Sequence, residues 1–396
     1  MLDHYGIKVR YNVIKKRLDY DIPGLKTSID NQDNASIQHI LSLASLNRFS
    51  TQAITGYVET IADAHPVNPV LDWIKSKPWD GQDRIHSICQ TLVVPQDYPP
   101  QIRDIFVTKW LRSAVAALCK QHFRARGVLT LQGAQGLGKT AWVRSLIPDA
   151  ALRESVLKLD HHLDAGDKDS KLLGISHWIT ELGELDSSLK KDIARLKGFL
   201  TADTDKIRRP YAKTESEYAR RTVFCATVND ENFLVDPTGN SRFWTIPVVG
   251  INYEHHIDMQ QVFAQALAQV QDGLIWWLDR DEEDNLTELN KRHRAVSAIR
   301  EMVLDVAVKA GQRGAQGPSR VSASQFLSVH GHIKSPTTAQ AKEAAQALRE
   351  LYGEPVTRSG GVVKWDVYIR ADIQTHPHSS YHQAASGGPI YDDEDF

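Results

Sequence analysis

The chain has 396 residues, of which 41% are hydrophobic and 24% are charged, as is ordinary for a globular protein of two or three domains. Its net charge of −2 excludes a uniformly basic nucleic-acid binder, so any contact with nucleic acid must be confined to a local loop or channel lining. Only three cysteines occur, without metal-ligand spacing, and neither a membrane-spanning apolar run nor a signal peptide is apparent, which together predict a reduced, cytoplasmic protein.

The first 64 residues combine strand-like and helical patterns. Residues 6–13 are strand-like, whereas residues 37–46 and 51–62 repeat their apolar side chains at helical spacing. The prolines and the asparagine of HPVNP, residues 65–69, break the pattern and predict a linker. We therefore expect a small N-terminal segment over residues 1–64.

A helical stretch is predicted between this linker and residue 124. Short helices flank a turn at residues 77–81, with the sequence KPWDG, and residues 102–122 place apolar side chains such as Phe106 and Trp110 on one broad helical face. We expect residues 65–124 to form a helical domain that precedes the central part of the chain.

Residues 125–300 show the alternation of an α/β fold, in which apolar β-rich runs alternate with helical or polar segments. A helical region is expected over residues 259–278. We interpret the charged run that follows it, residues 279–284, as a solvated loop. Strands are predicted at residues 128–131, 176–180, 222–227 and 242–247.

The last part of the chain predicts a small separate unit after a glycine-rich link at residues 311–318. Helical patterns at 322–329 and 339–352 precede a hairpin pattern with two glycines, 360 and 361, at its turn. Helix, helix and hairpin within residues 301–372 predict a winged-helix-like domain. Residues 373–396, which end in DDEDF, predict a disordered acidic tail that is either simply solvated or an interaction peptide for a protein partner.

The most specific motif is the phosphate-loop pattern GAQGLGKT, which follows the strand at 128–131 and opens a helical stretch. Glycine lets backbone N–H groups close around phosphate oxygens, Lys139 neutralises the β- and γ-phosphates, and the Thr140 hydroxyl ligates Mg²⁺. The sequence therefore predicts a site for ATP and Mg²⁺. The predicted loop comprises Gly133, Ala134, Gln135, Gly136, Leu137, Gly138, Lys139, Thr140 and Ala141.

An acidic residue is expected at the end of a neighbouring apolar strand, where it serves Mg²⁺ and the attacking water. The run LLGISHWITELGEL places Glu181 at such a strand end and Glu184 three residues later. We predict Glu181 as the catalytic and metal-site carboxylate. Glu184 is a second candidate, which suits a helix cap or a solvent-facing position equally well. Glutamate in place of the usual aspartate leaves two roles open, contact with Mg²⁺ and polarisation of the water.

A basic segment, DTDKIRRPYAKTE, lies between Glu181 and the next predicted strand. It contains four cations around an aromatic residue: Lys206, Arg208, Arg209 and Lys213. In a hairpin with its tip near residues 212–215, these cations point away from the core and bind the phosphate backbone of DNA by charge. The alternative is an ordinary charged hairpin, because acidic residues are interleaved.

Two further residues complete the predicted catalytic set. Asn229 follows the strand at 222–227, and an amide at such a strand tip holds the attacking water or the γ-phosphate, although asparagine also suits a plain turn. Arg242 opens the strand at 242–247 and is predicted to act as an arginine finger on ATP bound by a neighbouring subunit. The alternative for Arg242 is a structural ion pair.

These motifs in this order resemble the virulence-associated E family of phage and mobile-element proteins, whose core is similar to superfamily 3 helicases and AAA+ ATPases. The resemblance covers roughly residues 65–250 and rests on many short motifs, each of them weak alone. The segments that carry it are VNPVL (67–71), WDGQDRI (79–85), GAQGLGKT (133–140), WITELGEL (178–185), LKGFL (196–200), RPY (209–211), RTVF (221–224), ATVN (226–229) and GNSRFW (239–244).

The resemblance implies an α/β P-loop ATPase core of the AAA+ or superfamily 3 helicase type that forms a hexamer on DNA. It also implies a replicative helicase or an origin-binding ATPase of a phage or satellite, in the bacterial host cytoplasm. Replication proteins are the expected partners if the acidic tail is an interaction peptide. Members often carry a primase-like domain ahead of this region. Because only 64 residues precede it here, without an apparent carboxylate triad, we do not expect primase activity.

We therefore expect an ATP-dependent DNA helicase or translocase. One alternative is a regulatory or scaffold ATPase whose nucleotide state switches a protein partner without strand separation. Another is a DNA-binding initiator that uses the C-terminal unit while the ATPase controls assembly. Stimulation of hydrolysis by single-stranded DNA and opening of a forked duplex distinguish the first function from the regulatory or scaffold ATPase. DNA footprinting with a fragment that starts near Met302 distinguishes the initiator.

Overall fold

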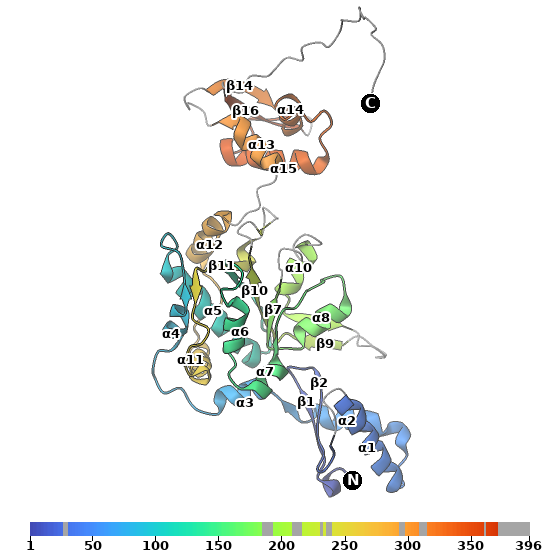
Figure 1. Cartoon of the computed structure of the whole chain (residues 1–396). Coiled ribbons are helices and arrows are strands. Elements are labelled where there is room, and N and C mark those ends of the chain that lie inside the picture. Colours follow the sequence, from blue (N-terminus) through green and yellow to red (C-terminus); the bar gives the residue numbers. More distant parts are fainter. Residues whose placement is uncertain are drawn as a thin grey trace, which may run out of the picture. The chain divides into compact units, whose positions relative to one another are not determined.

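The computed structural model describes residues 1–26, 31–183, 193–207, 216–229, 233–234, 240–292, 298–308, 315–359 and 362–370. The chain divides into two units, Met1–Ala295 and Val296–Phe396, which are drawn in Figure 1. The segments 1–64, 65–124 and 125–295 all belong to the first unit. Among the helices of the described ranges, none has the length and apolar content that crossing a lipid bilayer requires.

A parallel sheet forms the centre of the first unit. Its strands are β5 (Val128–Gln132), β6 (Leu157–Lys158), β7 (Ile179–Leu182), β10 (Val223–Val228) and β11 (Phe243–Pro247). They lie in the order β11, β5, β10, β7, β6, and every neighbouring pair is parallel. This sheet, with helices between its strands in sequence, confirms the predicted α/β class.

Both faces of the sheet are buried, because successive side chains along each strand enter different cores. Leu129 and Leu131 of β5 join one core, whereas Val128 joins the other. The first core also contains residues of α5 (Pro100–Cys119), α6 (Lys139–Ser145) and α11 (Met259–Gln271), and the second contains residues of α8 (Lys168–Ile175) and α10 (Ile193–Leu200) (Figure 1). The helices on the two faces thus hold the strands as a central layer.

Buried tryptophans fix the helices to this sheet. The indole N–H of Trp110 in α5 donates to the carbonyl oxygen of Phe224 in β10 at 2.8 Å. The indole N–H of Trp178, just before β7, donates to the carbonyl oxygen of Ala114 in α5, also at 2.8 Å. Because a buried indole N–H needs an acceptor, each ring both fills the core and sets the position of α5 against the strands.

Short elements precede α5 and pack with it and with α11. They are α3 (Pro69–Lys75), α4 (Ile85–Gln90) and β4 (Leu92–Val93). Asn68 caps α3 by accepting from the amide of Leu71 at 3.1 Å, and Pro69 occupies the first turn. Asparagine and proline in this order favour a helix start, so the end of the predicted linker begins a helix.

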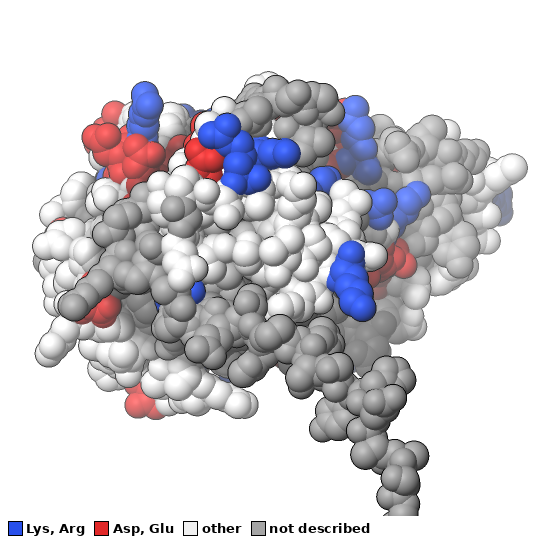
Figure 2. Space-filling model, turned by 90° about the horizontal axis from the view of Figure 1, so that it is seen from above, with Lys and Arg blue, Asp and Glu red and all other residues white. Residues whose placement is uncertain are grey.

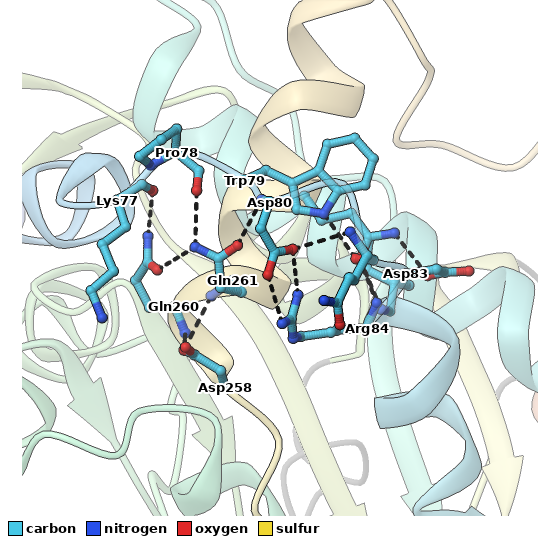
Figure 3. Close-up of polar contacts among 12 residues, drawn as sticks. Lys77, Pro78, Trp79, Asp80, Asp83, Arg84, Asp258, Gln260 and Gln261 are labelled. Carbon is cyan, nitrogen blue, oxygen red and sulfur yellow. Dashed lines mark hydrogen bonds and ion pairs between the residues drawn. The ribbon is translucent and has the colours of Figure 1, made fainter.

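The loop between α3 and α4 is held against α11 by glutamine side chains (Figure 3). Gln260 donates to the carbonyl oxygen of Lys77 at 2.8 Å, and Gln261 donates to that of Pro78 at 3.0 Å. Gln261 also accepts from the amide of Asp80 at 2.9 Å. The WDGQDR segment therefore takes its shape from a helix about 180 residues further along the chain.

The N-terminal residues form a second, small sheet. It contains β1 (Lys8–Asn12), β2 (Arg17–Asp21) and β3 (Pro66–Val67), beside η1 (Asp3–Tyr5), α1 (Gln32–Leu46), η3 (Thr51–Ala53) and α2 (Ile54–Asp63). The central strand β1 pairs antiparallel with β2 and parallel with β3. Ile40 of α1 and Val58 of α2 are buried with Val9 of β1 in one apolar cluster. The predicted strand and both predicted helices are present, and β2 is an addition to them.

The charged run at 279–284 is not the solvated loop that its composition predicts. It begins α12 (Arg280–Arg292), where Asp279 accepts from the amide of Glu282 at 3.0 Å and Glu282 accepts from the amide of Asp279 at 2.8 Å. This reciprocal cap, with more acidic side chains in the first turn, stabilises the helix start. Glu282 also pairs with Lys109 of α5. The helix expected over 259–278 correspondingly ends earlier, at Gln271.

The second unit is a smaller α/β arrangement. Its elements are α13 (Ala298–Val306), β13 (Ala307–Val308), β14 (Ala315–Val321), α14 (Ala323–Val329), α15 (Thr338–Tyr352), β15 (Thr357–Ser359) and β16 (Val362–Arg370). Strand β16 pairs antiparallel with β13, β14 and β15, and Phe326, Leu348 and Trp365 are buried in the shared core. Strand β14 occupies part of the segment predicted as a link. The predicted acidic tail, residues 373–396, lies outside the described residues.

Candidate nucleotide site

The glycine-rich segment connects β5 to α6 at the carboxyl ends of the parallel strands. Gly136 and Gly138 both have φ of +85°, a left-handed conformation that residues with a Cβ atom rarely adopt. A Cβ atom on Gly138 would also overlap the ring of Tyr253, and one on Gly133 would overlap the carbonyl oxygen of Val248. The backbone of this loop therefore needs glycine at these positions.

Lys139, the first residue of α6, turns its ammonium group back into the loop. It donates to the carbonyl oxygens of Gly133 at 2.7 Å and Ala134 at 2.8 Å, and to Oδ1 of Asn229 at 2.9 Å. The residue is only 7% exposed. Burial lowers the pKa of this ammonium group, an effect that the nearby charge of Glu181 opposes. The structure thus brings Lys139 and Asn229 into direct contact.

Glu181 lies in β7 and is 0% exposed. Its Oε1 accepts from the hydroxyl groups of Thr140 at 2.6 Å and Thr227 at 2.8 Å, and its Oε2 accepts from the amide of Asp160 at 3.1 Å. A buried carboxylate needs such donors, because burial of an unpartnered charge strongly destabilises a fold. The structure brings together Thr140 and Glu181, which the sequence separates by 41 positions.

Strand β10 connects the contact between Lys139 and Asn229 with the hydrogen bonds of Glu181, because it lies between β5 and β7. Cys225 of β10 is opposite Glu181 of β7 in the register of the two strands. Thr227, two residues further, is on the same face and reaches the carboxylate diagonally. Asn229 follows at the end of the strand, beside the ammonium group of Lys139.

A cavity of about 630 Å³ opens above the loop. This volume is within the range of ligand pockets, roughly 300 to 1,000 Å³. The cavity is lined by Gln135, Gly136, Gly138, Lys139, Thr140, Ala141, Asp160, Gly183, Thr227, Val228 and Asn229. Predicted residues from the loop and from the end of β10 therefore face one space.

Asp160 and Thr227 also line the cavity, and neither was predicted. Asp160 follows β6 and has φ of 53°, a conformation in which aspartate is tolerated better than most residues. Non-glycine residues in this region carry strain that is often found at functional sites. The short stretch VLKLD, residues 156–160, ends in a carboxylate as the Glu181 strand does, and that signal could have identified Asp160.

Arg242 lies at the opposite end of the sheet from the cavity. It ends the turn η4 (Asn240–Arg242), and the next residue, Phe243, is opposite Val128, the first residue of β5. Asn290 of α12 holds this turn by donating to the carbonyl oxygens of Asn240 at 2.9 Å and Phe243 at 3.0 Å. The loop leaves β5 at its other end, about 16 Å away at roughly 3.3 Å per residue. Arg242 is therefore not brought together with the phosphate loop of its own chain.

Two paired strands flank the basic segment, as the predicted hairpin requires, and its expected tip near residues 212–215 lies outside the described residues. Strands β8 (Thr204–Ile207) and β9 (Ser216–Ala219) pair antiparallel. Lys206 is exposed and forms an ion pair with Glu217 across the hairpin, at 3.7 Å, which at the surface contributes at most about 1 kcal/mol to stability. The other predicted DNA-binding residues and the second carboxylate candidate lie outside the described residues: Arg208, Arg209, Lys213 and Glu184.

Basic side chains on the face seen in Figure 2 gather in separate groups among neutral and acidic residues. This distribution agrees with the net charge of −2.

The residues around the cavity fit a nucleoside triphosphate with Mg²⁺. Lys139 provides a buried cation, Thr140 a hydroxyl ligand, and Glu181 a carboxylate that already bonds to that hydroxyl. Backbone turns such as those at Gly136 and Gly138 form anion-binding concavities in many phosphate sites. Mg²⁺ prefers oxygen ligands and usually combines one or two protein groups with water and phosphate oxygens. The lysine and glycine turns therefore suit the phosphate groups, and the hydroxyl and carboxylate oxygens suit Mg²⁺.

A family model of the virulence-associated protein E-like domain matches residues 74–295, which is more than half of the chain. The chain belongs to the virulence-associated protein E-like family. The sequence-based recognition of this family is thereby confirmed. In this virulence-associated protein E-like chain, the match includes every residue that lines the cavity, as well as Glu181 and Arg242.

Solved apo structures of the NrS-1 C-terminal region are similar to this virulence-associated protein E-like chain. One, an A form of residues 305–718, has 16% identity and a TM-score of 0.45, and the alignment covers 93% of this chain and 97% of that one. Two others have 14% identity and TM-scores of 0.39 and 0.40, and each alignment covers 92% of this chain, with 97% and 98% of theirs. No curated protein matches the chain.

Proposed function

We propose that this chain is an ATP-dependent DNA translocase or helicase of phage or mobile-element replication, which hydrolyses ATP at the subunit interfaces of a hexameric ring. One observation carries the proposal. Lys139 and Thr140 from the loop, Glu181 from β7 and Asn229 from the end of β10 converge through direct hydrogen bonds beside one cavity. Phosphoryl transfer to water requires a cation that neutralises the phosphate charge, a ligand for the metal and polar groups that position the water. Lys139, Thr140, and the carboxylate and amide of Glu181 and Asn229 are groups of these kinds.

Each side chain has one task in this proposal. Lys139 neutralises the β- and γ-phosphates, and Thr140 holds Mg²⁺, with Asp160 or Glu181 as an acidic neighbour. Mg²⁺, when bound, screens the charge on the phosphate oxygens. Glu181 polarises the attacking water, and Asn229 orients it. The hydrogen bond from Thr140 to Glu181 fixes the hydroxyl and the carboxylate relative to each other at 2.6 Å.

The strand order supports a core of the AAA+ or superfamily 3 helicase type. Strand β10, which ends beside Asn229, lies between the loop strand β5 and the acidic strand β7. The loop, the amide and the carboxylate therefore lie at the carboxyl ends of three neighbouring strands. Arg242 lies at the amino end of β11, on the opposite side of the sheet from these groups. In this proposal it therefore stabilises the transition state in the site of a neighbouring subunit.

Two features favour DNA as the polymer that is moved. The hairpin of β8 and β9 carries Lys206 near its base and three more cations in its sequence, which suits contact with a phosphate backbone. In the second unit, α13, β14, α14, α15 and the pair β15–β16 follow one another in the order of a winged-helix domain. The proposal assigns DNA contacts to both.

Steady-state ATP hydrolysis by the full chain tests this function. We expect hydrolysis that depends on Mg²⁺ and that single-stranded DNA stimulates severalfold, together with opening of a forked duplex that ATP supports and ADP does not. Hydrolysis that DNA leaves unchanged, with the fork still closed, would contradict a translocase and favour a nucleotide-switched initiator or scaffold. Lack of hydrolysis under all of these conditions would contradict the ATPase itself.

A further inference from the structure

The segment that connects α5 to β5, residues 120–127, carries cations and no carboxylate. Its sequence is KQHFRARG, and neither aspartate nor glutamate occurs anywhere between Asp104 and Asp149. The side chains of Lys120 and Arg124 are exposed. Because the segment leads into β5, it lies at the amino end of that strand, whereas the phosphate loop follows the carboxyl end.

Two further cations join this segment at Cys119, the last residue of α5. Burial raises the pKa of the Cys119 thiol, and the positive charges of Lys75, Lys120 and Arg221 oppose that shift. Lys75 ends α3, and Arg221 lies two positions after β9. The guanidinium group of Arg221 also donates to the carbonyl oxygen of Leu118 at 2.9 Å. Cations from three separate parts of the chain therefore surround the end of α5.

This group, which we call the α5-end basic cluster (Lys75, Lys120, Arg124 and Arg221), has positive charge that carboxylates do not neutralise. Within the ranges that the structure describes, none of its members forms an ion pair. Arginines of the second unit, in contrast, are paired: Arg300 with Glu350, Arg320 with Asp366 and Arg349 with Glu354. Cations that are close together repel one another, so such a cluster attracts an anionic partner.

The α5-end basic cluster lies at the base of the hairpin of β8 and β9. Nε of Arg124 donates to the carbonyl oxygen of Thr201 at 3.1 Å, and Thr201 is three positions before the first residue of β8. Arg221, on the other side of the hairpin, follows β9 and leads into β10. Both ends of the hairpin therefore begin beside the cluster.

We propose that the α5-end basic cluster binds the phosphate backbone of single-stranded DNA where the strand continues past the base of the hairpin. This inference rests on the proposed function and adds to it a second group of phosphate contacts, separate from the cations of the hairpin. Lysine and arginine bind phosphates by charge and without regard to sequence, as a translocating protein requires. The cluster lies at the amino ends of β5 and β10, so bound DNA leaves the nucleotide cavity at their carboxyl ends free.

The first test measures binding of a fluorescent oligothymidylate to the full chain by anisotropy over a salt series. We expect the triple variant Lys75→Ala, Lys120→Ala and Arg124→Ala to reduce the slope of log K against log salt by roughly two, at about 0.7 per phosphate contact. Arg221 is left intact, because it is half-buried and holds the end of α5.

Two controls separate the effect of charge from other effects of substitution. A variant that keeps all three charges, with Lys75→Arg, Lys120→Arg and Arg124→Lys, should keep the wild-type slope. The matched control removes three exposed cations of the N-terminal segment and should also keep it: Lys8→Ala, Lys26→Ala and Arg48→Ala.

The second test uses Cys119 as a probe within the cluster. It is exposed, whereas the other two cysteines of the chain, Cys89 and Cys225, are buried. A saturating amount of oligothymidylate should slow the alkylation of Cys119 by iodoacetamide, followed by mass spectrometry, whereas polyglutamate at the same concentration of charge should not. In the triple alanine variant, the oligothymidylate should no longer protect the thiol.

Several results would overturn the inference. A wild-type slope in the triple alanine variant would remove the cluster from the DNA path, and a reduced slope in the charge-keeping variant would show that charge is not its role. Equal protection of Cys119 by polyglutamate would indicate a surface for acidic proteins instead. A wild type that does not bind the oligothymidylate at all would contradict the proposed function itself.

Discussion

Glu181 has no exposed surface, and two hydroxyl groups and an amide donate to its carboxylate. One of those hydroxyls, on Thr140, belongs to the phosphate loop, and the other, on Thr227, belongs to the strand that ends beside Asn229. In a low-dielectric interior, such linked hydrogen bonds strengthen one another and limit how far each group moves. A change at the loop therefore acts directly on the carboxylate. Because Glu181 is behind Thr140 and is not one of the residues that line the cavity, we expect a change at Glu181 to affect chemistry more than nucleotide binding.

We predict that Glu181→Gln lowers the rate of ATP hydrolysis at least about a hundredfold, the usual effect of removing a catalytic base. The amide keeps the size of the side chain and an acceptor for Thr140, so ATP affinity should change only a few fold. Single-turnover hydrolysis and equilibrium titration with ATP measure the two effects. The control is Glu154→Gln on the exposed side of α7 (Ala150–Val156), which should alter neither. Wild-type hydrolysis by Glu181→Gln would exclude the assigned role.

At this scale, motif spacing predicts residues whose chemistry depends on chain order. Lys139 and Thr140 follow from the loop pattern, and Glu181 and Asn229 follow from polar residues at the ends of apolar strands. Thr227 could not be predicted, because its contact with Glu181 depends on the register of β10 against β7. Asp160 was missed because the strand before it is only two residues long, which is too short for an alternating strand pattern to be recognised in the sequence.

The hairpin is fixed to the core by a buried ion pair at its base. Arg220, which follows β9, donates from Nε to Oδ2 of Asp205 at 2.7 Å and from Nη2 to Oδ1 at 2.6 Å. Its guanidinium group lies over the rings of Phe199 and Phe224, the latter in β10. Bidentate pairing and stacking on aromatic rings give such an arginine one well-defined position. The base of the hairpin is therefore tied to the strand that leads to Asn229.

We predict that alanine at Lys206, Arg208, Arg209 and Lys213 together weakens binding of single-stranded DNA and makes it less dependent on salt. Losing four phosphate contacts should reduce the slope of log K against log salt by roughly three, at about 0.7 per contact. Fluorescence anisotropy over a salt series measures this slope. A variant with four exposed N-terminal cations removed (Lys8, Arg10, Lys26 and Arg48) is the matched control and should keep the wild-type slope. Equal slopes in all three proteins would exclude DNA contact by the hairpin.

Elements with strong periodicity were predicted well, and their ends were predicted less well. Strands β5, β10 and β11 lie within a residue or so of their predicted positions, since each is a continuous apolar run. The strand predicted at 176–180 is found at Ile179–Leu182, because α8 continues to Ile175 and a bend follows it. Helix α12 was missed because net charge was given more weight than the Asp279 and Glu282 capping pattern that starts it.

At the scale of the whole molecule, the positions of Lys139 and Arg242 at opposite ends of the sheet suggest how subunits would cooperate. Contacts between one edge of a subunit and the opposite edge of the next are heterologous, and they close into a ring when the rotation between subunits permits. In such a ring, Arg242 of each subunit would face the loop of its neighbour. Neither half of the site would then hydrolyse ATP efficiently alone.

Order along the chain was the most informative property for the architecture. The succession of loop, acidic strand, amide-tipped strand and GNSRFW segment predicted the α/β unit and its family, and the helix and hairpin patterns after residue 300 predicted a second unit, which begins at Val296. The packing of the WDGQDR loop on Gln260 and Gln261 of α11 was beyond prediction, because it joins residues about 180 positions apart.

The most direct test of a shared site is ATP hydrolysis by a mixture of two inactive variants, Lys139→Ala and Arg242→Ala. Each alone should lose about a thousandfold in rate or more, because every interface lacks one half of the site. Mixed rings contain some interfaces with Lys139 and Arg242 both intact, so we predict that mixing restores measurable hydrolysis. Mixing Lys139→Ala with the double variant, which offers no complete interface, should restore none. Full activity of Arg242→Ala alone, or a mixture as inactive as its components, would contradict the account.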